Sequence, residues 1–292
     1  MSERYLITGG GGQLASDLEA LLGARAEVRA PGRGELDVTD DAAIATLFEA
    51  FAPTAVINCA AFHNVEVCER EEDRSFEVNA RAVKRLATRS AEAGARFVHL
   101  STNYVFDGTA AEPYDEAALP NPRSIYAISK LAGEYAALSY APDALVVRTA
   151  GLYGLHGSVS KGGNFVTRMI ARAKSDPRPP ALKMVADQRL TPTFTADLAA
   201  AIIGALDAGF SGIQHVTNAG ETSWHGFTQE IMRLAGIDVA VEEATTVIAP
   251  GAADRPLNGV LRSTTGLAPL RSWDDALPDY LARAGLLAAT PA

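Results

Sequence analysis

The stretch that decides the fold is YLITGGGGQLA, residues 5–15 of the 292-residue chain. A short apolar run leads into a cluster of glycines and then into a segment with leucines on one helical face. Gly9, Gly12 and Ala15 hold the three spaced positions of a dinucleotide fingerprint. Glycines let backbone N–H groups approach a phosphate, and the small Ala15 lets the helix pack closely on the strand. The stretch therefore predicts a strand, a turn and a helix that bind a dinucleotide; a tight turn with no ligand is the alternative.

Short apolar runs alternate with longer helical patterns through the first half of the chain. This alternation favours an α/β fold with a doubly wound parallel sheet of the Rossmann type, whose ligand crevice lies at the carboxyl ends of the strands. We expect strands at residues 5–8, 26–29, 55–59, 96–101 and 144–148, and helices at 13–22, 42–51 (capped by Asp40), 76–93 and 126–140.

The pattern loosens after about residue 150, where Gly- and Pro-bearing stretches separate shorter elements. We expect residues 1–150 to form the dinucleotide-binding domain, with residues 187–220 and the C-terminal helix packing back on it. Residues 151–186 and 221–267 should form a smaller α/β substrate-binding lobe.

The chain is acidic, with a formal net charge of −9 and a pI near 5.1. A surface of that sign repels nucleic acid and anionic lipid, and no dense Lys/Arg run overrides it. No apolar stretch is long enough to cross a bilayer, and the N-terminus leaves no room for a signal peptide. Cys59 and Cys68 match no metal-ligand spacing, and a disulfide between them is not favoured. We therefore expect a cytoplasmic protein with no metal site, no nucleic-acid partner and no membrane association.

The end of the second predicted strand indicates which dinucleotide is bound. An NAD enzyme usually places an acid there to hold the ribose hydroxyls, but residues 30–34 contain none. Arg29 and Arg33 lie close by, and a guanidinium can pair with a ribose phosphate through two hydrogen bonds. NADPH is therefore favoured over NADH, unless both arginines are simply solvated loop residues.

Tyr126 and Lys130 form the second group of interest, because residues four apart on a helix project from the same face. A free tyrosine has a pKa near ~10, and a nearby ammonium lowers it toward the working range of a proton donor. The preceding strand ends on Ser101 and Thr102, whose hydroxyls can bind a carbonyl oxygen. Two surface helix residues are the alternative. However, a glycine turn after the first strand, a hydroxyl after a later strand and the Tyr/Lys pair on the next helix occur in the right order, and together they predict a reductase site.

These residues resemble the extended short-chain dehydrogenase/reductase superfamily and, within it, the dTDP-4-dehydrorhamnose reductase family. The segment STNYVFDG (101–108) and the pair DQ (187–188) and TPT (191–193) are far more specific than the glycine turn. The other matching segments are residues 8–15, 56–61, 78–80, 126–134, 147–149, 163–165, 222–224 and 255–256.

The resemblance implies NADPH-dependent reduction of dTDP-4-dehydrorhamnose to dTDP-L-rhamnose, and it suggests a homodimer. Hydride would pass from C4 of the nicotinamide to C4 of the sugar. Tyr126 would protonate the new alkoxide, Thr102 would orient that transfer, and Lys130 would hold the ribose and lower the tyrosine pKa. Besides Gly9 and Arg33, the implied cofactor contacts are Gly12, Gln13 and Leu14 at the pyrophosphate, Asp37 and Val38 on the adenine side, and Ala60 and Ala61 at the nicotinamide. The implied substrate contacts are Thr102, Asn103 and Gly151 at the sugar, and Asn164 and Arg255 at the diphosphate.

The chain departs from the family pattern where the hexose should lie. The family usually has aspartate at the position of Asn103 and often has tryptophan at that of Gly151, while His63 either touches the sugar or packs in its loop. A different 4-keto-6-deoxyhexose, or the opposite stereochemistry at C4, is therefore also compatible with the sequence.

Three further classes of protein share parts of this pattern. A dehydratase is disfavoured because it needs an acidic residue beside the threonine, and this sequence has none next to Thr102. An epimerase can use the same threonine, tyrosine and lysine, so the residues named above do not exclude it. A non-catalytic subunit, like the regulatory subunit of methionine adenosyltransferase, would keep the fold and the cofactor site, but the intact pair Tyr126 and Lys130 argues against that role.

Overall fold

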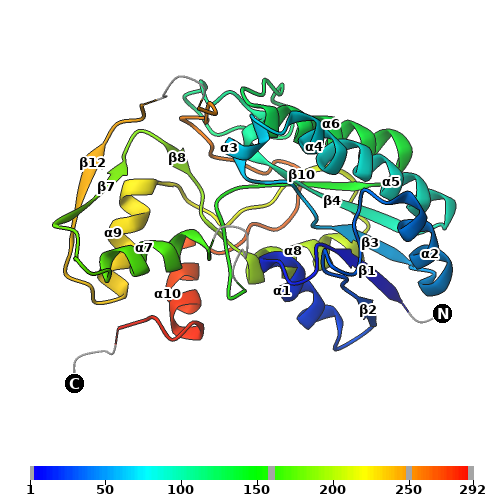
Figure 1. The fold of residues 1–292 in the computed structure, drawn as a ribbon, viewed down its shortest axis with the longest axis horizontal. Coiled ribbons are helices and arrows are strands. Elements are labelled where there is room, and N and C mark those ends of the chain that lie inside the picture. Colours follow the sequence, from blue (N-terminus) through cyan, green and yellow to red (C-terminus); the bar gives the residue numbers. More distant parts are fainter. Residues whose placement is uncertain (1–2, 157–161, 248–251, 289–292) are drawn as a thin grey trace.

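The computed structural model describes residues 3–156, 162–247 and 252–288 (Figure 1). Its centre is a sheet of six strands, each parallel to its neighbours. Their order is β10 (Gly212–His215), β5 (Leu145–Thr149), β4 (Arg96–Thr102), β3 (Ala55–Asn58), β1 (Arg4–Thr8) and β2 (Glu27–Arg29). The chain runs from β1 outward to β2 and then crosses to β3 on the other side of β1. The strand order therefore reverses between β1 and β3, which is where such sheets open a ligand crevice.

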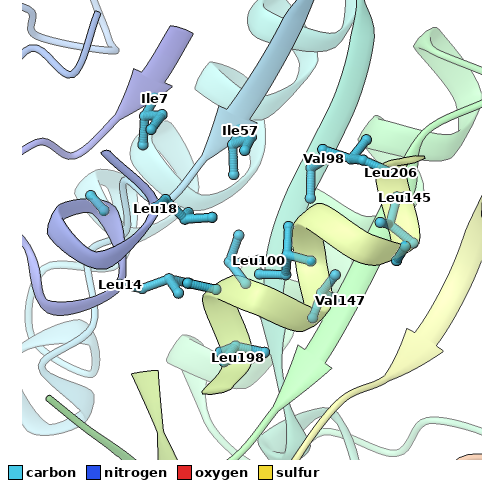
Figure 2. Packing of buried hydrophobic residues seen from close by; sticks show 14 of the residues in the cluster. Ile7, Leu14, Leu18, Ile57, Val98, Leu100, Leu145, Val147, Leu198 and Leu206 are labelled. Atoms are coloured by element: carbon cyan, nitrogen blue, oxygen red, sulfur yellow. The ribbon is translucent and has the colours of Figure 1, made fainter. Parts of the chain in front are cut away.

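Successive side chains of the central strands face opposite sides of the sheet. Ile7, Ile57, Val98 and Val147 are fully buried on one side against α1 (Gln13–Leu22) and α8 (Thr195–Asp207), where Figure 2 shows Leu14, Leu18, Leu198 and Leu206 lying over them. Their neighbours Leu6, Val56, Phe97 and Val146 pack on the other side against α2 (Asp41–Phe51), α5 (Ala82–Glu92) and α6 (Ile125–Tyr140). Each such side chain contributes about 1.5–3 kcal/mol on burial, so two apolar layers hold the helices to the sheet.

The predicted elements of the first half are confirmed except in one helix. Helix α1 spans residues 13–22 as predicted, and Asp40 caps α2 by accepting hydrogen bonds from the N–H groups of Ala42 and Ala43 at 3.0 and 3.1 Å. The long helix predicted at 76–93 is present as a continuous helical run over residues 72–92, but it begins earlier and contains a π-helical turn that was not predicted. Its parts are α4 (Glu72–Phe76), the π-helical turn η1 (Glu77–Arg81) and α5. The wide turn directs Asn79 inward, where its amide is fully buried and hydrogen-bonded.

A second lobe lies at the far end of the molecule from β2 (Figure 1). It consists of α7 (Phe165–Ala173), α9 (Trp224–Leu234), α10 (Trp273–Arg283) and the parallel pair β7 (Ala181–Val185) and β12 (Ala240–Ala244). Two further short pairs, β6 (Leu152–Tyr153) with β9 (Thr193–Phe194) and β8 (Arg189–Leu190) with β11 (Thr222–Ser223), complete the strands. The remaining elements are the short helix α3 (Val65–Cys68) and the 3-10 turn η2 (Asn103–Val105).

The C-terminal helix α10 packs in this second lobe and not on the dinucleotide-binding domain, so the prediction for it is wrong. Ala276, Leu277, Tyr280 and Leu281 form one apolar face of α10 and are fully buried in the same core as Phe227 of α9. Rings of the lobe pack on that face, with the Tyr280 ring 5.1 Å from Tyr153 and 5.6 Å from Phe194. Edge-to-face pairs of this kind contribute about 0.5–1.5 kcal/mol each beyond burial, so they help to hold α10 in the lobe. From the segment 187–220, α8 and β10 do lie on the main sheet.

The contact of α6 with the π-turn requires glycine at position 133. A Cβ atom at Gly133 would lie 2.2 Å from the Asn79 carbonyl oxygen and 3.1 Å from Nε2 of His99. We predict that Gly133→Ala lowers the free energy of unfolding by about 3 kcal/mol, because the helix must move away from its neighbours. Gly204→Ala in α8 is the matched control, since a Cβ there meets no atom within 4 Å. That change should stabilise the protein by about 0.5–1 kcal/mol. Urea denaturation measures both, and equal effects would contradict the close approach.

Candidate active site

A cleft of about 1860 Å³ lies at the carboxyl ends of the strands and extends to the second lobe. All of the site residues predicted from the sequence line it. They are Gly9, Gly12, Gln13, Leu14, Arg33, Asp37, Val38, Ala60, Ala61, Thr102, Asn103, Tyr126, Lys130, Gly151, Asn164 and Arg255.

The glycine turn is shaped by its neighbours. Gly9 has a φ of +77°, and a Cβ there would lie 2.9 Å from the Ala60 nitrogen, while a Cβ at Gly10 would lie 1.9 Å from the Ala30 oxygen. Glycine is therefore needed for β1 to meet the ends of β2 and β3 so closely. Helix geometry leaves the N–H groups of the first turn of α1 without intrahelical partners, and no side chain caps that end. This part of the cleft can bind a pyrophosphate.

The loop after β2 presents a cation to the cleft. Arg33 is exposed and makes no ion pair within the described part of the chain. Glu35 is turned back on its own loop, because its carboxylate accepts a hydrogen bond of 3.0 Å from the N–H of Gly32. Asp37 accepts hydrogen bonds from both the N–H and the hydroxyl of Thr39, which lower the pKa of its carboxyl. Arg33 is therefore the cation that this loop brings to the cleft, with Asp37 beside it.

Asn79 joins the loop that follows β3 to helix α6. Its side-chain oxygen accepts from the N–H of Phe62 at 2.8 Å, and its amide nitrogen donates to the Phe62 carbonyl at 2.9 Å and to the Ser129 hydroxyl at 3.0 Å. The loop that carries Ala60 and Ala61 is thus held beside the helix that carries Tyr126. In the sequence, Asn79 appeared only within the family resemblance, since a buried asparagine has no signal of its own.

Tyr126 lies in the first turn of α6 and packs edge to face on Tyr104, with ring centres 5.8 Å apart. Burial raises the pKa of Tyr126 well above its usual value, and a hydrogen bond with Thr102 opposes this rise. The sequence predicted the opposite direction, with Lys130 lowering this pKa. That prediction is wrong because the Lys130 nitrogen is turned toward β4, where it donates to the Leu100 carbonyl.

Lys130 is buried, with 2% of its surface exposed. Its nitrogen lies 3.5 Å from Nε2 of His99, in addition to the bond with Leu100. Burial lowers the pKa of Lys130 to about 8, against the attraction of Glu134. The site therefore contains a lysine that changes charge near neutral pH.

Thr102 and Asn103 stand at the end of β4. The Thr102 hydroxyl accepts a hydrogen bond from the N–H of Tyr104 at 3.2 Å, which orients it at the cleft wall. Asn103 donates from its amide nitrogen to the Gly259 carbonyl at 2.9 Å and is buried. An aspartate, which has no such donor, could not make this bond when ionised.

Three residues predicted to contact the substrate make close contacts with other parts of the protein. Gly151 has a φ of +57°, and a Cβ there would lie 3.1 Å from Pro192 and 3.2 Å from Leu190, so the position contributes backbone only. Asn164 caps α7 by accepting from the N–H of Thr167 and donates to the Gly154 carbonyl and the Tyr280 hydroxyl, which uses its whole amide. Arg255 pairs with Glu66 at 3.0 Å, the surface ion pair that an arginine commonly makes.

Basic side chains of the second lobe also face the cleft, and they were not predicted from the sequence. Arg168 and Arg172 project from α7 into the cleft, and Lys183 joins them from β7. None of the three side chains has a hydrogen bond or an ion pair within residues 3–156, 162–247 and 252–288. Helix α7 is strongly amphipathic, with Val166, Met169 and Ile170 buried on its other face. The i, i+4 spacing of the two arginines was the available signal.

The remaining sequence predictions concern metals, thiols and membranes. In the described part of the chain, no group of three or more His, Cys, Asp or Glu side chains could hold a metal ion. Within the described residues, neither Cys59 nor Cys68 forms a disulfide. None of the helices within the described ranges has the length and apolar character needed to span a membrane.

Comparison with known proteins identifies relatives along the whole chain. Residues 3–285 match the model of the family described as RmlD substrate binding domain. The dTDP-4-dehydrorhamnose reductase of Streptomyces griseus is 41% identical, over 97% of this chain and 95% of the relative. The dTDP-4-keto-6-deoxy-D-glucose reductase of Streptomyces niveus is 37% identical, over 95% and 96%. The crystal structure of dTDP-4-dehydrorhamnose reductase from Bacillus anthracis in complex with NADP superposes with a TM-score of 0.90 at 32% identity, covering 97% of this chain and 99% of that one.

The hydrogen bonds of Asn164 generate a prediction about its role. Asn164→Ala removes the cap of α7 and leaves the Gly154 carbonyl and the Tyr280 hydroxyl without this partner. We expect the free energy of unfolding to fall by about 2–3 kcal/mol. Arg255→Ala, which removes only a half-exposed ion pair, should cost less than about 1 kcal/mol. Chemical denaturation measures both variants, and an Asn164→Ala protein as stable as Arg255→Ala would show that the amide does not support the lobe.

Proposed function

Because the chain belongs to the dTDP-4-dehydrorhamnose reductase family, we propose that it is an NADPH-dependent reductase of the 4-keto group of a dTDP-linked 6-deoxyhexose. Its leading substrate is dTDP-4-dehydrorhamnose, which it converts to dTDP-L-rhamnose. The observation that carries the proposal is the convergence of Tyr126, Thr102 and Lys130 with the glycine turn in one cleft.

The residues at the sheet edge fit NADPH. The uncapped first turn of α1 offers N–H groups to the pyrophosphate, and Gly12, Gln13 and Leu14 form that turn. The side-chain oxygen of Gln13 is buried there without a hydrogen-bond partner among the described residues, which fits a polar ligand. Arg33 is the cation for the 2′-phosphate, while Asp37 and Val38 lie at the adenine side and Ala60 and Ala61 at the nicotinamide side. When bound, NADPH supplies the hydride that is added to the carbonyl carbon.

Tyr126 acts as the general acid. Reduction of a ketone requires a proton for the carbonyl oxygen, and the raised pKa of Tyr126 keeps its phenol protonated at neutral pH. The Thr102 hydroxyl donates to the same oxygen and orients the transfer. Lys130 holds the ribose hydroxyls when its nitrogen turns away from Leu100 toward the cleft. Only in that position does its ammonium also stabilise the tyrosinate that remains.

The second lobe binds the nucleotide half of the substrate. Arg168 and Lys183 replace Arg255 as our leading candidates for the diphosphate, because Arg255 is paired with Glu66 and they are not paired in the described structure. Asn164 supports this region by capping α7. The sugar lies between Thr102, Asn103 and the backbone of Gly151.

The identity of the sugar has a second candidate. One relative is named for dTDP-4-dehydrorhamnose and another for dTDP-4-keto-6-deoxy-D-glucose, at similar identities. Asn103 and Gly151 lie at the cleft, so a different 4-keto-6-deoxyhexose or the other C4 configuration fits the same chemistry. A homodimer, a cytoplasmic location and the lack of nucleic-acid or membrane partners stay predictions of the sequence.

Activity with a panel of substrates tests the proposal. Purified protein should oxidise one NADPH for each dTDP-4-keto-6-deoxyhexose that it reduces, and it should oxidise NADPH faster than NADH. Loss of NADPH absorbance measures the rate, and NMR of the product gives the configuration at C4. Tyr126→Phe should lower kcat by at least ~100-fold, because it removes the proton donor. Tyr135→Phe, at an exposed position of the same helix, should leave kcat unchanged. No oxidation of NADPH with any member of the panel would overturn the proposal, and turnover without net NADPH consumption would indicate an epimerase.

The assignment of the diphosphate site is tested by kinetics. Arg168→Gln should raise KM for the nucleotide sugar by about 10-fold with little change in kcat, because it removes a charge-assisted contact with a part of the substrate that does not react. Arg255→Gln should change KM less than 3-fold, about the effect of a weak surface contact. A larger rise in KM for Arg255→Gln than for Arg168→Gln would assign the diphosphate contact to Arg255.

A further inference from the structure

A chain of buried polar side chains crosses the sheet from β1 to helix α6. The Thr8 hydroxyl lies 2.6 Å from Oδ1 of Asn58, and Nδ2 of Asn58 lies 3.1 Å from Nδ1 of His99. On the other side of its ring, Nε2 of His99 lies 3.5 Å from the Lys130 nitrogen. Thr8, Asn58 and His99 are each at most 2% exposed, and none of them has a role in the reaction proposed above.

The donors and acceptors along this row of polar side chains determine which ring nitrogen of His99 carries the proton. The N–H of Ala60 donates to the Thr8 hydroxyl, so the hydroxyl proton is directed to Oδ1 of Asn58. The amide nitrogen of Asn58 is then the donor to Nδ1 of His99, which must be unprotonated. Burial lowers the pKa of His99 well below its usual value, so the ring is neutral and carries its proton on Nε2.

The His99 proton therefore points at the nitrogen of Lys130. An ammonium has only donors, so it cannot accept this N–H, whereas a neutral amine has a lone pair that can. The ring is fully buried and lies close to α6, since a Cβ at Gly133 would lie 3.1 Å from the same Nε2.

The other titratable groups near Lys130 act in both directions. On α6, Glu134 favours the ammonium, but its carboxylate is shared with Arg148 at 2.7 Å. Beyond β3, burial raises the pKa of the Cys59 thiol to about 12, so this group is neutral at physiological pH. Tyr126 is neutral as well, since burial raises its pKa. His99 is the group from β4 that faces the lysine nitrogen.

We propose that His99 is a positioning residue for Lys130: Thr8 and Asn58 hold it as the Nε2–H tautomer, and its N–H disfavours the protonated lysine. The consequence for catalysis rests on the proposed function, in which the ammonium form of Lys130 is needed. Activity should then be lost as pH rises through the lysine pKa of about 8. A change that converts Nε2 into an acceptor should move this loss to higher pH.

NMR of the protein tests the tautomer without reference to activity. The chain has five histidines and five lysines, so the resonances can be assigned by single substitutions. The ¹⁵N shifts of wild-type His99 should show a bare Nδ1 and a protonated Nε2, with no titration from pH 5 to 9. A protonated Nδ1, or a His99 that titrates near its usual pKa of ~6.5, would overturn the proposal.

Two variants test the effect on Lys130, followed by the ¹³Cε shift of the lysine and by the pH profile of kcat. In Asn58→Asp the carboxylate can only accept, so the proton moves to Nδ1 and Nε2 faces the ammonium as an acceptor. In His99→Gln the amide can turn its oxygen to Lys130 without adding a charge. Both variants should raise the titration midpoint of Lys130 by about one pH unit, a tenfold change in proton affinity, and should move the loss of kcat at alkaline pH upward by the same amount. His225→Gln is the control, since this buried histidine bonds to Val241 in the second lobe, and it should move neither.

The outcomes separate the two proposals. If the wild-type tautomer is as stated but neither variant moves the Lys130 midpoint, the role of His99 is wrong. If the midpoint moves while the wild-type protein reduces no member of the substrate panel, the proposed function fails and the role of His99 stands. If the midpoint moves and the alkaline limb of kcat does not follow it, the effect on catalysis is wrong.

Discussion

Helix α6 is held against the sheet by a buried ion pair, and the geometry of the site depends on this contact. Glu134 of α6 and Arg148 of β5 meet at 2.7 Å with 2% and 1% of their side chains exposed, and a second bond from the arginine makes the pairing bidentate. Ser101 of β4 donates to the same carboxylate. Loss of one partner of such a pair leaves a buried charge, which typically costs about 3–5 kcal/mol. The pair therefore holds α6 in one register relative to β4 and β5.

That register decides the positions of the groups that we assign to catalysis. Tyr126 and Lys130 lie two turns and one turn before Glu134 on α6, and Thr102 follows Ser101 on β4. A second set of bonds, from Asn79 to Phe62 and Ser129, holds the loop after β3 to the same helix. The proton donor, the hydroxyl and the predicted nicotinamide side of the cleft are thus parts of one rigid arrangement. Preorganised polar groups of this kind need little rearrangement when charge develops on a substrate oxygen.

Asn103 and Gly151 are two of the positions at which the sequence departs from the pattern of the family it resembles, and they act differently in the structure. The Asn103 amide donates to the Gly259 carbonyl, a bond that an ionised aspartate could not make, and so joins the end of β4 to the segment before residue 260. Gly151 has a left-handed conformation with Pro192 and Leu190 close by, so a large side chain there would require the backbone to move. The first change alters hydrogen bonding and the second alters space at the cleft. Both residues line the cleft, so we expect them to bear on which sugar is accepted.

Patterns within short segments of the sequence were enough to predict the parallel sheet and the residues that line the cleft. The run at residues 5–15, the cap at Asp40 and the alternation of strands and helices determined the parallel sheet, because each depends on neighbours in the sequence. The same is true of the segments that indicated the family, and with them of the candidate residues that line the cleft.

Properties that depend on contacts between distant segments were decided only by the tertiary structure. The π-turn at Asn79 depends on Phe62 and Ser129, and the place of α10 depends on the aromatic core of the second lobe. The pKa of Tyr126 rises because the fold buries it and turns Lys130 toward Leu100, whereas helical spacing alone predicted a fall. Sequence by itself determined which groups meet at the sheet edge; their charge states and hydrogen-bond partners followed from burial, which no single segment encodes.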